Sequence, residues 1–206
     1  MKRIAFLVSL LAVSTAAAHS QESRQDISLS GTALIEPYKA SSTDIQVHST
    51  TAYGGLVSYR FMLTPSSALE GNYGITYQNK ITYYGSQFQG GISVLTRNQE
   101  ISGAYVRSFV FKNFNPFVEA GPAALVFMPI QNSGTKTLDA KRETEIGAMY
   151  GAGFAYEVSP SFDIRVEYRG QVVKVPTFGV GSSSYNFTTN RWYNISVPTV
   201  GVAYHF

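Results

Sequence analysis

Apolar and ionisable side chains alternate almost without interruption between residues 162 and 172. Successive side chains of a β-strand point to opposite faces, so this segment predicts a strand with one apolar face and one charged face. The apolar face carries Phe162, Ile164, Val166, Tyr168 and Val172, and the charged face carries Asp163, Arg165, Glu167 and Arg169. This segment alone does not tell whether the apolar face meets a protein core or a membrane.

The same two-residue period recurs along the chain in segments that end at residues favouring turns. No segment combines a helical period with helix caps, and none after the N-terminus has the apolar length of a membrane helix. The sequence therefore predicts an all-β chain. The predicted strands lie near residues 26–36, 52–63, 68–78, 97–110, 116–127, 145–158, 161–173 and 192–206.

The connections between these strands alternate in length. Short turns are predicted at 64–67, 112–115 and 158–161, and longer loops at 37–51, 79–96, 128–144 and 174–191. Short turns at one end and long loops at the other are typical of a membrane-spanning β-barrel.

The two faces of the predicted strands also differ in size. In segment 145–158, large residues such as Tyr150 and Phe154 oppose Gly151 and Gly153. A narrow lumen requires small residues beside a few long ones, whereas lipid favours large apolar side chains. We therefore predict a transmembrane antiparallel up-and-down β-barrel of about eight strands, with a polar lumen filled by side chains. The apolar face of 162–172 then points to lipid.

Two positions interrupt this pattern. Arg107 shares a face with Tyr105 and Phe109, which indicates either a side chain reaching toward lipid headgroups or a bulge that shifts the register. Pro122 cannot donate to a strand ladder, so a bulge or local kink is expected at Gly121-Pro122.

The N-terminus has the features of a cleaved signal peptide over residues 1–18. Lys2 and Arg3 precede an apolar run, and Ala16-Ala17-Ala18 provides small residues for cleavage. We expect an exported domain of residues 19–206. Removal of the peptide leaves 14 basic and 13 acidic residues, so the balance of charge does not favour nucleic acid as a partner. The chain has no cysteine.

The chain ends in Thr199-Val200-Gly201-Val202-Ala203-Tyr204-His205-Phe206. Thr199, Gly201, Tyr204 and Phe206 match the pattern of a C-terminal assembly signal. With this octapeptide and the signal peptide, the chain resembles the small eight-stranded bacterial outer-membrane β-barrel family, which includes the OmpA membrane domain and OmpX. The resemblance implies integral insertion in the outer membrane by the barrel assembly machinery, with both termini periplasmic. Nothing follows Phe206, so we expect no peptidoglycan-binding domain.

The predicted lumen carries most of the ionisable residues. An interior of this width holds side chains, so we expect ion-pair networks there, with Arg165 and Arg169 as centres for surrounding carboxylates. A narrow conductance pathway is the alternative. The residues of the predicted network are Glu36, Arg60, Glu70, Glu100, Glu119, Glu157, Asp163, Arg165, Glu167 and Arg169.

These features favour a structural or surface-interaction role, in which outer loops contact lipopolysaccharide or an external partner. A small porin-like transport or ligand-binding barrel is the main alternative. A lipid A-modifying enzyme is more distant, because its only candidate residues are His48, Ser49 and Asp44 in a predicted loop. We expect no catalytic site, metal or cofactor. The sequence does not indicate the oligomeric state.

Overall fold

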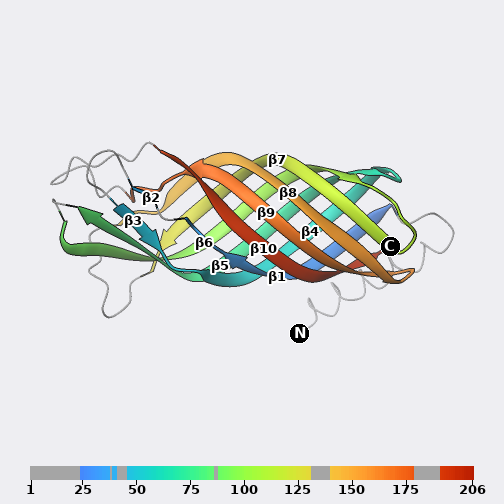
Figure 1. The fold of residues 1–206 in the computed structure, drawn as a ribbon, viewed down its shortest axis with the longest axis horizontal. Helices are drawn as coiled ribbons and strands as arrows, with labels where there is room; N and C mark the ends of the chain where they lie inside the picture. The colour runs from blue at the N-terminus through green and yellow to red at the C-terminus, as the bar shows by residue number, and fades with distance from the viewer. Residues whose placement is uncertain (1–23, 38, 41–45, 86–87, 131–139, 179–190) are drawn as a thin grey trace, which may run out of the picture.

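Eight long antiparallel strands form a closed barrel in the computed structural model (Figure 1). The structure describes residues 24–37, 39–40, 46–85, 88–130, 140–178 and 191–206. The predicted signal peptide lies outside these residues. The barrel strands are β1 (Gln25–Leu34), β4 (Ala52–Thr64), β5 (Ser67–Gly85), β6 (Phe88–Ser108), β7 (Phe114–Pro129), β8 (Glu143–Ser159), β9 (Phe162–Lys174) and β10 (Trp192–His205).

The strands follow the order β5-β4-β1-β10-β9-β8-β7-β6, and pairing of β5 with β6 closes the barrel. Two short strands, β2 (Lys39–Ala40) and β3 (Gln46–Ser49), extend the sheet beside the far part of β5. We call the end with the short turns, Gln25 and His205 the terminal end, and the opposite end the loop end. The predicted all-β barrel is confirmed. No helix among the described residues has the length and apolar character to cross a membrane.

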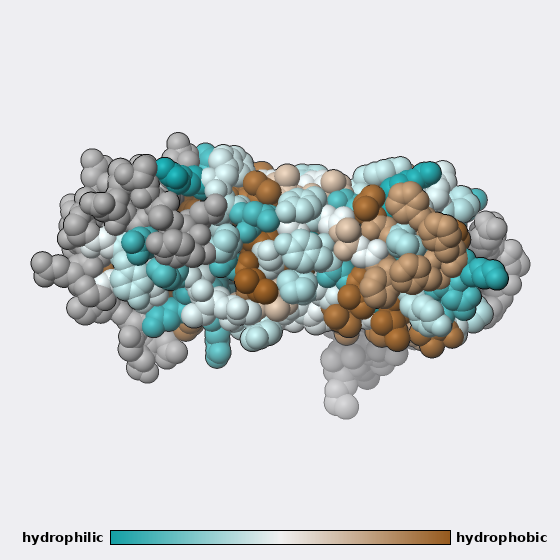
Figure 2. All heavy atoms as spheres, viewed as in Figure 1, coloured by the Kyte–Doolittle hydropathy of each residue, from teal (hydrophilic) through white to brown (hydrophobic). Residues whose placement is uncertain are grey.

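Large apolar side chains cover the outside of the barrel. On β9, Phe162, Ile164 and Tyr168 are exposed, whereas Asp163 and Arg165 are buried inside. The apolar row of this strand therefore points outward, as predicted. Figure 2 shows apolar residues concentrated toward the end of the barrel that carries the C-terminus.

The prediction of a loop at 79–96 is wrong. β5 continues to Gly85, and β6 begins at Phe88, so most of this segment forms a long hairpin. The register shifts between Thr76 and Asn79, where Gln78 has a φ of 61°. This bulge moves the inward positions from even to odd residue numbers and hides the continuation of the alternation.

The other two irregular positions keep the strand register. Arg107 is exposed on the outer face and donates to the Ser67 hydroxyl over 2.8 Å, without a bulge beside it. Pairing of β6 with β7 is interrupted opposite Gly121 and Pro122, but no extra residue is inserted. The bulge considered at each of these positions is therefore absent.

The Tyr150 ring lies over Gly170 on the outer surface of β9. An ideal Cβ at Gly170 would lie 2.3 Å from Cζ of this ring, so only glycine leaves room for it. The Tyr150 hydroxyl accepts a hydrogen bond from Asn194 Nδ2 on β10 at 3.0 Å. One aromatic side chain on β8 thus spans two neighbouring strands.

Replacement of Gly170 by alanine should destabilise the barrel by about 1–3 kcal/mol, because the new methyl group displaces the ring. Gly71→Ala is the matched control, since an ideal Cβ there meets nothing within 4 Å. Urea unfolding in lipid vesicles measures both. Equal stability of the two variants would contradict the proposed role of the Tyr150 contact.

Candidate functional site in the barrel interior

Arg169 lies at the centre of the interior and is 0% exposed. Its guanidinium is 2.7 Å from Glu100 Oε1 on β6, 3.3 Å from Glu119 Oε1 on β7 and 3.2 Å from Glu167 Oε1 on β9. It also donates to the Ser102 hydroxyl over 3.0 Å. Charge-assisted hydrogen bonds of this kind compensate for removing the charge from water. We call Arg169, Glu100, Glu119 and Glu167 the hub.

Two more ion pairs lie toward the terminal end. Arg60 and Glu70 face each other on β4 and β5, with 2.6 Å between Nη2 and Oε2. Arg165 Nη2 lies 2.6 Å from Asp26 Oδ2 on β1. Charged side chains therefore occupy the terminal-end half of the interior from the hub to the mouth.

The structure brings eight of the predicted lumen residues into contact with an ionisable partner. Asp163 reaches His205, with 2.8 Å between Oδ2 and Nε2. The other seven belong to the ion pairs just described. The eight residues are Arg60, Glu70, Glu100, Glu119, Asp163, Arg165, Glu167 and Arg169.

Glu36 and Glu157 differ from this expectation, because neither forms a salt bridge with a described residue. Glu36 lies beyond the end of β1 and accepts hydrogen bonds from Ser49 and Asn79. Burial raises the pKa of Glu36 to about 7, although these two hydrogen bonds lower it. Glu157 is half-buried at the terminal end, opposite Asp163 in the strand register.

Asp26 and His205 belong to the interior but were not among the predicted lumen residues. Both lie at the terminal end, where they pair in register across the seam between β1 and β10. Asp26 is 0% exposed. The alternation of Asp26 with Ile27 and Leu29 indicates an inward position and could have identified it.

The loop-end half of the interior is mainly apolar, which was not predicted from the sequence. Buried side chains from most of the strands pack there, and Tyr83 among them had been predicted to lie in a loop. We call these residues the apolar cluster. Its members are Leu34, Val47, Ala52, Ile81, Tyr83, Val94, Leu125, Phe127, Val173, Val175, Phe178, Tyr193, Ile195 and Val197.

Phe178 packs against the rest of the apolar cluster at the loop end of the barrel. It lies beyond the end of β9, is 0% exposed and packs edge-on against Phe127, with 6.3 Å between ring centroids. Its φ of 54° is unusual for a residue with a side chain. The Glu143 carboxylate accepts hydrogen bonds from the backbone N–H groups of Thr177 at 2.6 Å and Phe178 at 2.5 Å. Glu143 therefore holds Phe178 in the mouth.

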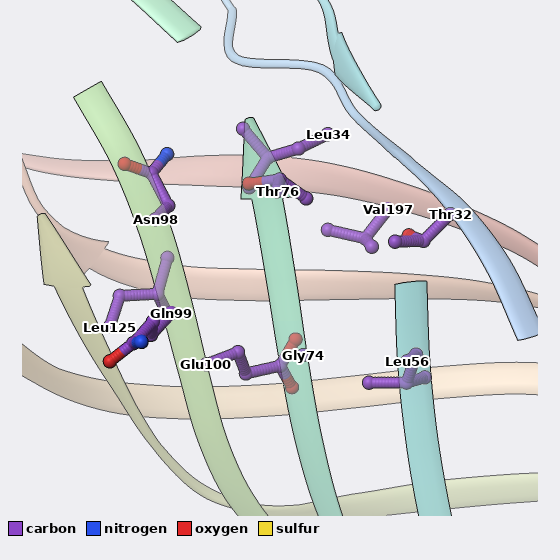
Figure 3. A pocket seen from close by; sticks show the side chains of 10 residues that line it. All are labelled: Thr32, Leu34, Leu56, Gly74, Thr76, Asn98, Gln99, Glu100, Leu125 and Val197. Carbon is purple, nitrogen blue, oxygen red and sulfur yellow. The ribbon is translucent and has the colours of Figure 1, made fainter. Parts of the chain in front are cut away.

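A small cavity separates the apolar cluster from the hub (Figure 3). Leu34 and Leu125 line it on the apolar side, and Glu100 lines it on the hub side. It has room for about one water molecule. The interior is thus occupied along its length, by charged residues at one end and apolar residues at the other.

Two of the three residues considered for catalysis, His48 and Ser49, are described by the structure and do not face a common site. His48 and Ser49 are neighbours on β3, so their side chains point to opposite faces. His48 packs edge-on against Tyr84, whereas Ser49 donates to Glu36. Asp44 lies outside the described residues. Within the described part of the chain, no group of three or more His, Cys, Asp or Glu residues could hold a metal ion.

The C-terminal residues named from the sequence lie on β10 and just beyond it. Thr199 is buried, and Gly201 is half-buried. The Tyr204 ring lies 5.1 Å from the Phe162 ring and 6.1 Å from the Phe206 ring, measured between centroids. These aromatic residues form a cluster on the outside of the terminal end. Their role in assembly stays a prediction.

Arg169→Ala should destabilise the barrel by about 3–5 kcal/mol, because it leaves three buried carboxylates without their cation. Glu119→Gln is the matched variant: it preserves the shape and leaves Arg169 with two carboxylates, so it should cost less than half as much. Urea unfolding in lipid vesicles measures both changes. If Arg169→Ala is as stable as the parent, the hub does not stabilise the fold.

Comparison with known proteins places this architecture in context. None of the curated proteins compared with the chain matches it. Among solved structures, Neisserial surface protein A is 14% identical, with 89% of this chain and 98% of that chain covered and a TM-score of 0.59. OprG from Pseudomonas aeruginosa is 13% identical, with coverages of 90% and 97% and a TM-score of 0.62.

Ail, the attachment invasion locus protein of Yersinia pestis, is 14% identical, with coverages of 90% and 100% and a TM-score of 0.52. At these identities the likeness concerns the fold. The family model described as "Outer membrane protein beta-barrel domain" matches residues 4–206. The chain therefore belongs to the outer-membrane β-barrel family and is an integral protein of the bacterial outer membrane.

Proposed function

We propose that this protein is a non-conducting surface-interaction barrel whose loop end contacts the phosphate groups of lipopolysaccharide. In this orientation both termini are periplasmic and the loop end faces outward. The proposal excludes catalysis by the barrel. Insertion by the barrel assembly machinery, through the C-terminal residues described above, is part of the same proposal.

The main support for this proposal is that acidic and basic side chains lie on different faces of the barrel wall. On the strands, wherever exposure is described, the charged side chains that face outward are all Lys or Arg, whereas the Asp and Glu side chains face inward. The charged residues that face outward are Lys80, Arg97, Arg107 and Lys174. Three of the four lie toward the loop end. Basic groups at headgroup level favour anions such as phosphate.

The surroundings of Lys174 fit a membrane interface. Its Nζ lies 5.8 Å from the centre of the Trp192 ring, and Trp192 is exposed. Trp residues prefer the level of the lipid headgroups, with the ring toward the apolar region. Lys174 is therefore held at the height where phosphate groups are expected.

The occupied interior supports the non-conducting part of the proposal. An ion crossing the barrel would have to displace Phe178 at the loop end and then separate Arg169 from Glu100 at the hub. Breaking a buried ion pair costs several kcal/mol, so such passages would be rare. In planar bilayers the purified protein should show no stable channels.

The triple variant Lys80→Gln, Arg97→Gln, Lys174→Gln should lose most of the stabilisation that lipopolysaccharide gives the barrel. Each basic residue near an anionic surface contributes about 1 kcal/mol, so the expected loss is about 3 kcal/mol. Unfolding in nanodiscs with and without lipopolysaccharide measures it. Arg107→Gln at the terminal end is the control and should behave as the parent. Equal stability of the parent with and without lipopolysaccharide would refute the contact.

The apolar cluster favours a second candidate function, binding of a small apolar solute in the loop-end half. Phe178→Ala removes the side chain that closes this half and should increase uptake of N-phenyl-1-naphthylamine, measured by its fluorescence. Phe111→Ala, at an exposed position of the terminal end, is the control. Equal uptake by the parent and both variants would eliminate this candidate.

A further inference from the structure

The terminal-end mouth contains a pocket distinct from the hub and from the apolar cluster. It has a volume of about 100 Å³ and opens to solvent, and Arg60, Arg165, Asp163, His205, Val110 and Ala155 contribute to its walls. A space of this size holds a phosphate or a carboxylate group. The chemistry of the walls identifies what such a site would bind.

Two guanidinium groups line the pocket, and their main carboxylate partners do not. Arg60 pairs with Glu70 and Arg165 pairs with Asp26, but neither Glu70 nor Asp26 belongs to the lining. Asp26 is 0% exposed. The pocket therefore presents the cationic members of both pairs.

Arg165 has a donor that the protein does not use. Its residue exposure is 4%, and it contacts Asp26 through Nη2, whereas its Nε has no hydrogen-bond partner. A buried donor without a partner is costly, and more so when it carries charge. Because this Nε atom has almost no accessible surface, a ligand in the pocket can reach Arg165 only through the terminal nitrogens of its guanidinium.

Asp163 is the one carboxylate in the lining, and His205 covers it. Their Nε2 and Oδ2 atoms are 2.8 Å apart. Two guanidinium groups thus face one carboxylate, and the lining has a net positive charge whichever protonation state His205 adopts. The Arg60 guanidinium is also held in place, 4.8 Å above the Phe117 ring. The excess of positive charge belongs to the lining itself, because Glu70 and Asp26, which pair with the two arginines, lie outside it.

We propose that this pocket binds a small oxyanion, a phosphate or a carboxylate, through the guanidinium groups of Arg60 and Arg165. Arginine donors match the geometry of both anions, and a partly desolvated site strengthens the contact. The proposal does not depend on contact with lipopolysaccharide, because the two sites lie at opposite ends of the barrel. The same phosphate chemistry could come from a free anion or from a phospholipid headgroup.

The test uses the full barrel in dodecyl maltoside micelles, which contain no phosphate, with inorganic phosphate and acetate titrated by calorimetry. Val110 is 60% exposed at the wall, so it tolerates substitution without loss of the fold. Val110→Asp should weaken phosphate binding about tenfold through charge repulsion. Val110→Asn introduces a side chain of nearly the same shape as aspartate but without its charge, and this variant should bind phosphate within about twofold of the parent.

Ala155→Met provides a second variant, because it fills the pocket without altering a charged group and should abolish binding. The proposal is overturned if the parent shows no saturable binding of either anion, or if Val110→Asp and Ala155→Met bind as the parent does. A short-chain phosphatidylglycerol then identifies the source. Competition with bound phosphate assigns the site to a lipid headgroup, and lack of competition assigns it to a free anion.

Discussion

Burial of the Arg169 guanidinium is the constraint on which the interior of this barrel depends. Eight strands enclose a space that side chains must fill, and a cation there is stable only with carboxylates around it. Glu100 and Glu119 come from β6 and β7, across the interior from β9, so the ion pairs connect different walls. Gly151 leaves space for this: an ideal Cβ there would lie 2.8 Å from Glu119 Oε1. The glycine at position 151 thus follows from the hub.

The inward-facing residues of a single strand change from charged to apolar along its length. On β9 these residues run from Asp163 through Arg169 and Gln171 to Val173, and Val175 continues the series beyond the strand. The terminal-end half is therefore closed by ion pairs and the loop-end half by apolar packing. These two forms of closure respond differently to conditions, because protonation of the carboxylates weakens the ion pairs, whereas temperature changes the strength of the apolar packing. Opening the whole interior requires both to fail.

The sequence predicted the features that arise from local alternation and missed those that arise from pairing across the barrel. Residues 162–172 were placed correctly because a two-residue period is a property of the strand itself. The extension of β5 was missed because a bulge at Gln78 inverts the alternation. Asp26 and Arg165 are 139 residues apart, so only the strand order shows that they pair. Phe178 lies outside any strand, and nothing periodic marks its inward position.

The distribution of charge connects the interior to the membrane. Carboxylates on the outer wall would face the anionic phosphates of the lipid, whereas inside they can pair with arginine. On the strands with described exposure, the acidic residues accordingly face inward and the outward-facing charges are basic. This arrangement gives most of the interior an excess of carboxylates, as the three acids around Arg169 show. The lining of the terminal-end pocket differs, because two arginines line it with one carboxylate while their partners Glu70 and Asp26 lie outside the lining. A lumen that only needed filling would not require both arginines to face the same recess, and an anion entering from the terminal end would explain this arrangement.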